Sequence, residues 1–132
     1  MSVATARNAL ADTSLFIALE QGRQLMNAPP SAVAVSVVTI GELRFGVLTA
    51  TDPAIRTQRL RTLTWAMSFD PLPVDDDVST AWAELRATVR QRRPKLGGND
   101  SWIAATAIAH GLPLATQDDD YDDLPGLVVI KL

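Results

Sequence analysis

The stretch Asn8-Ala9-Leu10-Ala11-Asp12-Thr13-Ser14-Leu15-Phe16-Ile17-Ala18-Leu19 passes from a short apolar run, through a hydroxyl-rich turn, into a second apolar run. The first run predicts a β-strand over residues 8–11. Asp12, Thr13 and Ser14 are residue types that cap helices, so the second run predicts a short helix. A strand that leads directly into a helix is the repeating unit of α/β proteins with a parallel sheet.

The same alternation continues along the chain. The valine-rich residues 32–38 predict a buried strand, after which Thr39 and Glu42 have the capping-box spacing that opens a helix. Asp52-Pro53 supplies a cap and a first-turn proline for the next helix, which we expect to pair antiparallel with its predecessor. The apolar residues expected to face inward from the first helix of this pair are Leu43, Val47 and Leu48.

The second half of the chain follows the same rules. Residues 71–74 are a weak candidate for an edge strand because two of the four are proline. Apolar residues at helical spacing then predict a helix to about Gln91, with its arginines on the far side. Asn99-Asp100-Ser101 is expected to cap a helix that ends at Gly111, and strands are predicted over 112–116 and 127–130. The helix predicted to end near Gln91 rests on Val78, Trp82, Leu85 and Val89.

Length and composition agree with one folded domain spanning residues 1–132, of which 47% are hydrophobic. The predicted fold is α/β, a three-layer α/β/α sandwich around a central, mainly parallel sheet. The chain contains no cysteine and one histidine, His110, so disulfide scaffolds, thiol nucleophiles and Cys/His zinc sites are excluded. No apolar run reaches the roughly 18 residues that predict a membrane span, and we expect a cytoplasmic location.

The charge distribution matters more than the net charge of −3, which by itself argues against a nucleic-acid partner. Residues 86–95 contain five basic side chains and no acid, which predicts a basic stripe for RNA backbone contacts. An ordinary solvated helix face remains the alternative. The basic stripe consists of Arg86, Arg90, Arg92, Arg93 and Lys95.

Four acids far apart in sequence, Asp12, Glu42, Asp100 and Asp118, are each predicted at the carboxyl edge of the sheet. Each has a structural explanation when taken alone, because caps and polar turns use the same residue types. Crowded carboxylates repel unless a cation neutralises them, and Mg²⁺ prefers oxygen ligands. Together they predict a magnesium site that hydrolyses phosphodiester bonds.

The motifs around these acids resemble those of PIN domains. The resemblance rests on Leu10–Ser14, Thr39–Leu43 with Gly46, Asn99–Ala105 and Thr116–Tyr121, which occur in the family's order across nearly the whole chain. The similarity is greatest to VapC-like toxins, which are small Mg²⁺-dependent endoribonucleases, commonly dimeric, each inactivated by a cognate antitoxin.

This resemblance implies roles for individual residues. Asp12 and Asp100 would be the main metal ligands, Glu42 and Asp118 would complete the pocket, and Mn²⁺ would substitute for Mg²⁺. Thr13, Asn99 and Thr116 would support the carboxylates. Tyr121 stands where phenylalanine is more usual, and the aspartate run leaves open whether Asp118 or Asp120 reaches the metal.

Two other classes of protein share some of these features. A receiver-like signalling domain has a similar length and an acidic Mg²⁺ pocket, but it should also show paired acids after the first strand, where this chain has Asp12 alone. A degenerate binding domain is disfavoured because all four acidic positions are filled. The apolar residues of the helix pair predict self-association or antitoxin binding. Trp65 is either a core residue or a partner anchor, and His110 is expected to be structural.

Overall fold

The computed structural model describes residues 7–92 and 96–132. The elements in chain order are β1 (Ala9–Ala11), α1 (Thr13–Glu20), β2 (Val33–Val35), α2 (Val37–Thr49), α3 (Pro53–Met67), α4 (Asp76–Val89), α5 (Gly98–Ala109), β3 (Leu114–Thr116) and β4 (Val129–Lys131).

The strands form one sheet in the order β2-β1-β3-β4, and every described pair is parallel. Each strand is only three residues long, shorter than the apolar runs predicted. Residues 71–74 contribute a single bridge between Leu72 and Ser36 rather than a strand. The two central strands of the sheet, β1 and β3, lie about 100 residues apart in the sequence.

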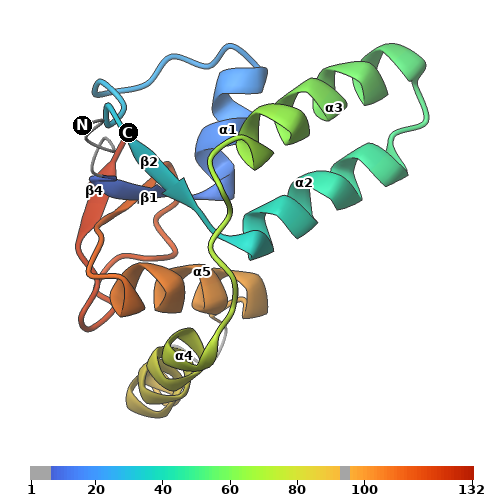
Figure 1. The fold of residues 1–132 in the computed structure, drawn as a ribbon. Coiled ribbons are helices and arrows are strands. Elements are labelled where there is room, and N and C mark those ends of the chain that lie inside the picture. The colour runs from blue at the N-terminus through green and yellow to red at the C-terminus, as the bar shows by residue number, and fades with distance from the viewer. Residues whose placement is uncertain (1–6, 93–95) are drawn as a thin grey trace, which may run out of the picture.

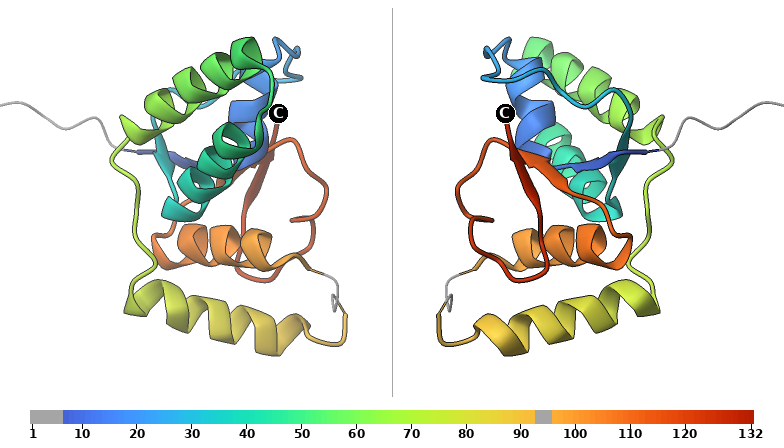
Figure 2. Two further views of the ribbon diagram at one scale, coloured as in Figure 1. Left: turned by 90° about the vertical axis from the view of Figure 1, so that its right-hand side faces the viewer. Right: turned by 90° about the vertical axis from the view of Figure 1, so that its left-hand side faces the viewer.

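Helices cover both faces of the sheet (Figure 1). Side chains alternate along a strand: Ala9 and Ala11 pack with Phe16 and Leu63 from the α1–α3 side, whereas Leu10 packs with residues of α4 and α5. Figure 2 shows α4 lying on the outer side of α5. These layers confirm the predicted three-layer α/β/α fold.

Two helices begin earlier than predicted. Ser36 caps α2, and its side chain accepts a hydrogen bond from the Val38 amide at 3.0 Å, so Thr39 and Glu42 lie inside the helix and do not form a capping box. Helix α5 begins at Gly98 after Gly97, which places Asn99 and Asp100 in its first turn. The capping prediction for Asn99–Ser101 was therefore wrong, because a glycine pair had already turned the chain into the helix.

The predicted antiparallel helix pair is α2 and α3, which project together beyond the edge of the sheet (Figure 1). Leu43 near the sheet is buried and Val47 is partly buried, but Leu48 is 73% exposed, so its predicted inward orientation was wrong. Beyond the sheet, α2 has only α3 to pack against. The ring of Trp65 packs on Phe16 while the residue is 45% exposed, so it belongs partly to the core, and its role as a partner anchor stays a prediction.

The helix predicted from Val78, Trp82, Leu85 and Val89 is α4, and it packs through this face. Trp82 stacks on Trp102 of α5 with ring centroids 4.5 Å apart. His110 is the C-cap residue of α5, as expected for a structural histidine, and Gly111 follows with φ +63°. Among the described residues, no helix has the length and apolar character needed to cross a bilayer.

Candidate active site

The candidate site lies where the chain order of the sheet reverses. From β1 the chain crosses to β2 on one side and later returns to β3 on the other, so the carboxyl ends of β1 and β3 diverge into a crevice. A cavity of about 540 Å³ opens there, and Asp12, Glu42, Asp100 and Asp118 all line it. The structure thus brings together the four acids that the sequence singled out.

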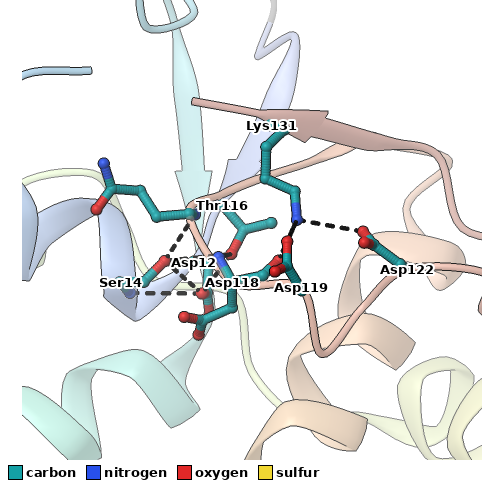
Figure 3. Close-up of polar contacts among 8 residues, drawn as sticks. Asp12, Ser14, Thr116, Asp118, Asp119, Asp122 and Lys131 are labelled. Carbon is teal, nitrogen blue, oxygen red and sulfur yellow. Dashed lines mark hydrogen bonds and ion pairs between the residues drawn. The ribbon is translucent and has the colours of Figure 1, made fainter. Parts of the chain in front are cut away.

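Asp12 is held on one carboxylate oxygen by hydroxyl groups. It caps α1 and is 2% exposed. Its Oδ2 accepts hydrogen bonds from the Ser14 hydroxyl at 2.7 Å and the Thr116 hydroxyl at 2.8 Å (Figure 3). One donor therefore lies in α1, directly after β1, and the other at the end of β3. Thr116 was among the predicted supporting residues and Ser14 was not, although its position two residues after a capping aspartate is a recognisable signal.

Asp100 is the most perturbed carboxyl of the site. Burial raises its pKa to about 6, and the neighbouring charges of Asp12, Asp120 and Asp118 act in the same direction. A hydrogen bond from Tyr121 partly counteracts these effects. A nearby cation would stabilise the ionised form of this carboxyl group.

Tyr121 connects the two best-buried acids and was not predicted as a site residue. Its hydroxyl oxygen lies 2.9 Å from Asp12 Oδ1 and 3.0 Å from Asp100 Oδ1. Burial, followed by these two carboxylates, raises the pKa of the phenol, so the hydroxyl keeps its proton. A tyrosine in place of phenylalanine was the available signal, because a buried phenol seeks a hydrogen-bond partner.

Glu42 reaches the cavity from the inner face of α2. The Thr13 hydroxyl lies 2.7 Å from Glu42 Oε1 and 2.9 Å from the Thr39 hydroxyl, so α1 orients an acid on α2. Asn99 is exposed and lines an adjoining cavity together with Thr13 and Glu42.

Asp118 belongs to the loop that follows β3. Its backbone amide donates to the Thr116 hydroxyl at 3.0 Å, and its pKa is raised by burial and by Asp12. Lys131 on β4 donates to the Asp118 carbonyl at 2.8 Å and pairs with Asp119 and Asp122 (Figure 3). Asp120 is exposed and is not among the described residues that line the main cavity.

The donor set fits a hard divalent cation in its chemistry. The lining acids offer only oxygen ligands, and burial, together with the charges of neighbouring acids such as Asp12, raises the pKa values of Asp100 and Asp118. Within residues 7–92 and 96–132, no three histidine, cysteine or acidic side chains lie close enough together to hold a metal ion by themselves. An open arrangement suits Mg²⁺, which retains several waters and is held by few carboxylates.

The basic stripe is only partly described by the structure. Arg86 donates to the Leu96 carbonyl at 3.2 Å, just before α5 begins, while Arg90 and Arg92 are exposed. Arg93 and Lys95 lie outside the described residues. Arg23, which is not part of the basic stripe, lines the cavity of the four acids.

Comparison with known proteins agrees with this geometry. The PIN domain family model matches residues 9–127. The chain is 47% identical over 131 residues to Ribonuclease VapC4 of Mycobacterium tuberculosis, covering 96% of this chain and 98% of that protein. It is 48% identical over 122 residues to Ribonuclease VapC5 of the same organism, covering 92% and 90% of the two chains.

A solved structure gives the same result. The crystal structure of VapBC-5, a member of the VapBC family of toxin-antitoxin systems from Mycobacterium tuberculosis, matches with a TM-score of 0.84 and 41% identity, over 96% of this chain and all of that one. The chain belongs to the PIN domain family. Within that family it is VapC-like, as its identity to two VapC ribonucleases shows.

Proposed function

We propose that this protein is a Mg²⁺-dependent endoribonuclease, the toxin of a toxin–antitoxin pair, acting in the cytoplasm as a single catalytic domain. Asp12 and Asp100 hold the metal ion, and Glu42 and Asp118 complete the pocket directly or through water. The observation that carries the proposal is the placement of these four acids around one cavity at the switch point of the sheet. The names of the related proteins, ribonucleases among them, support the same chemistry.

When bound, the divalent ion lowers the pKa of its water and stabilises the charge that develops on phosphate. The protein's own residues perform the remaining tasks. Ser14 and Thr116 fix the rotamer of Asp12, and Thr13 fixes that of Glu42. Asp118 faces the cavity from a loop, where it can orient a water molecule or a ribose hydroxyl. Mn²⁺ should substitute, because its preference for oxygen ligands is similar.

RNA is held next to the cavity by cationic side chains. Arg90 and Arg92 on the exposed side of the stripe contact the backbone, with Arg93 and Lys95 beyond them in the chain. Arg23 at the cavity itself supplies a further contact. Such contacts neutralise phosphates without reading sequence, and they offset the repulsion between RNA and an acidic pocket.

The partner is a cognate antitoxin, as suggested by the VapBC complexes among the related structures. Apolar side chains exposed on α2 and α3 offer a surface for a second copy of the toxin. A receiver-like or degenerate binding domain is the alternative. Neither alternative explains why hydroxyl groups orient three of these acids, Asp12, Glu42 and Asp100, toward one cavity.

The deciding experiment measures cleavage of single-stranded RNA by the wild type and by Asp12→Asn and Asp100→Asn, with Mg²⁺ and with excess chelator. We expect cleavage to fall by at least about 100-fold in either variant and to stop in chelator, because one carboxylate's loss removes a charge from the ion's site. Circular dichroism provides the folding control. Undiminished cutting in chelator, or by either variant, would exclude the proposed mechanism, and a labile aspartyl phosphate formed from a phosphodonor would favour the receiver.

A further inference from the structure

Tyr121 occupies a rigid position between two elements that are distant in sequence. Its residue is fully buried, and its ring packs in the apolar cluster that includes Ile103 of α5 and Leu124 of its own loop. Because the ring is buried, its hydroxyl oxygen is held at a fixed position. From there it contacts Asp12, which follows β1, and Asp100, which lies in the first turn of α5.

The two acids depend on this hydroxyl to different degrees. Asp12 has two hydroxyl donors on Oδ2, from Ser14 and Thr116, and meets Tyr121 only through Oδ1. For Asp100, the bond to Tyr121 at 3.0 Å is the one side-chain hydrogen bond within the described part of the chain. The rotamer of Asp100 thus rests on Tyr121, whereas that of Asp12 is fixed independently.

One hydroxyl proton serves two carboxylates. Without it, the two like charges would face each other across the same gap, and Asp100, the less restrained acid, would turn away from Asp12 toward solvent. A metal ion that needs both acids would then have to draw Asp100 back at a cost in binding free energy. Partners that orient metal ligands in this way typically contribute about 10–100-fold to metal affinity or activity.

We infer that Tyr121 is a positioning residue whose hydroxyl sets the spacing of Asp12 and Asp100 for a divalent cation. This inference rests on the proposed function, since it assigns the two acids to one ion. Tyr121 itself neither ligates the ion nor touches the substrate. Its side chain acts by holding the carboxylate of Asp100 close to the carboxylate of Asp12, which is already fixed in place.

The test is Tyr121→Phe, which keeps the buried ring and removes only the oxygen. The matched control is Thr106→Val, which removes a buried hydroxyl from the same helix as Asp100, where it donates to the Trp102 carbonyl at 2.8 Å and has no bond to any acid of the site. Both proteins are stripped of metal, checked for folding by thermal melting, and titrated with Mn²⁺ by calorimetry and electron paramagnetic resonance.

We expect Tyr121→Phe to weaken Mn²⁺ binding by about 10-fold and Thr106→Val to leave it unchanged. Cleavage by Tyr121→Phe should recover to within a few-fold of wild type at saturating Mn²⁺, since the ion itself then draws Asp100 into place. Unchanged or tighter Mn²⁺ binding by Tyr121→Phe would overturn the inference while leaving the proposed function intact. A wild type that binds no Mn²⁺ would overturn both.

Discussion

Asp12 and Asp100 line the same cavity but are stabilised very differently. Asp12 accepts hydrogen bonds from hydroxyl groups on α1 and β3, whereas Asp100 is desolvated near other acids and, among the described residues, its carboxylate accepts a side-chain hydrogen bond from Tyr121. The first residue therefore contributes to a stable fold even without metal. The second opposes folding until a cation neutralises it.

This difference predicts how stability varies with pH in the metal-free protein. The pKa of Asp100 is about 6 in the folded chain, above the ordinary value of 3.8 for this residue type, so the folded state holds its proton more tightly. Ionised Asp100 destabilises the fold fully above about pH 6, and the penalty disappears as the pH falls toward 4. In chelator, the contribution of Asp100 should make the melting temperature of the protein higher at pH 5 than at pH 7.

Asp100→Asn tests that expectation directly. The variant should be more stable than the wild type at pH 7 in chelator, by on the order of 1 kcal/mol given the partial exposure of the carboxyl. Its advantage should shrink at pH 5. Thermal melting of both proteins at the two pH values measures the effect, and equal melting temperatures at pH 7 would show that Asp100 carries no such penalty.

At the scale of elements, the loop between β3 and β4 holds Asp118 and Tyr121 without regular structure. Lys131 on β4 stabilises its first part through the Asp118 carbonyl and its ion pairs with Asp119 and Asp122. Exposed ion pairs contribute at most about 1 kcal/mol to stability. Their value here is geometric, because they determine where the loop presents Asp118.

Lys131→Met should therefore lower cleavage several-fold while changing the free energy of unfolding by less than about 1 kcal/mol. Hydrogen exchange should rise in residues 117–123 and stay unchanged in α5. Lys131→Arg, which retains the charge, is the control and should keep most of the activity. A wild-type exchange pattern together with reduced cleavage in Lys131→Met would show that Lys131 acts on substrate rather than on the loop.

The first residues of α2 and α5 were not predicted correctly from the sequence. Apolar patterns located each of the helices and the four strands along the chain, because burial of an apolar face is a local pattern, but they did not give the order of the strands in the sheet. Ser36 and Gly97 nevertheless began their helices before the expected caps at Thr39 and Asn99. Cap choice depends on which residue leaves the extended conformation first, and several suitable residue types lay side by side.

The site residues divide in the same manner. Asp12, Glu42, Asp100 and Asp118 were predictable from their places after strands and at helix starts. Ser14 and Tyr121 were not predicted as site residues. Some of their hydrogen bonds join residues more than 100 positions apart, as in the bond from the Gln117 amide to Ser14 and the bond from Tyr121 to Asp12. Such bonds depend on side-chain directions that only the packed sheet defines.

For the whole molecule, the main exposed apolar surface is on the projecting helix pair. Phe45 is 68% exposed and Leu48 is 73% exposed, while α2 and α3 extend beyond the sheet (Figure 1). Covering these side chains removes apolar area from water and favours association. This surface suits a second copy of the chain or an antitoxin.

We expect the wild type to be a dimer at high micromolar concentration and the double variant Phe45→Ser with Leu48→Ser to be a monomer. Sedimentation velocity measures both. Val128→Ser is the matched control, since Val128 is 67% exposed but lies in the loop before β4, away from the helix pair. A strictly monomeric wild type would exclude the predicted dimer. A double variant that still dimerises would place the interface elsewhere.

The order of the strands also bears on when activity can first appear during translation. Asp12 accepts a hydrogen bond from Thr116, which is 104 residues later in the chain, and β1 lies between β2 and β3, which both follow it in the sequence. A ribosome that has made the first half of the protein has produced Asp12 and Glu42 without the residues that hold and complete their cavity. The acidic cavity is complete only after Asp118 and Tyr121 have been synthesised, so we expect a growing chain that ends before them to have no nuclease activity.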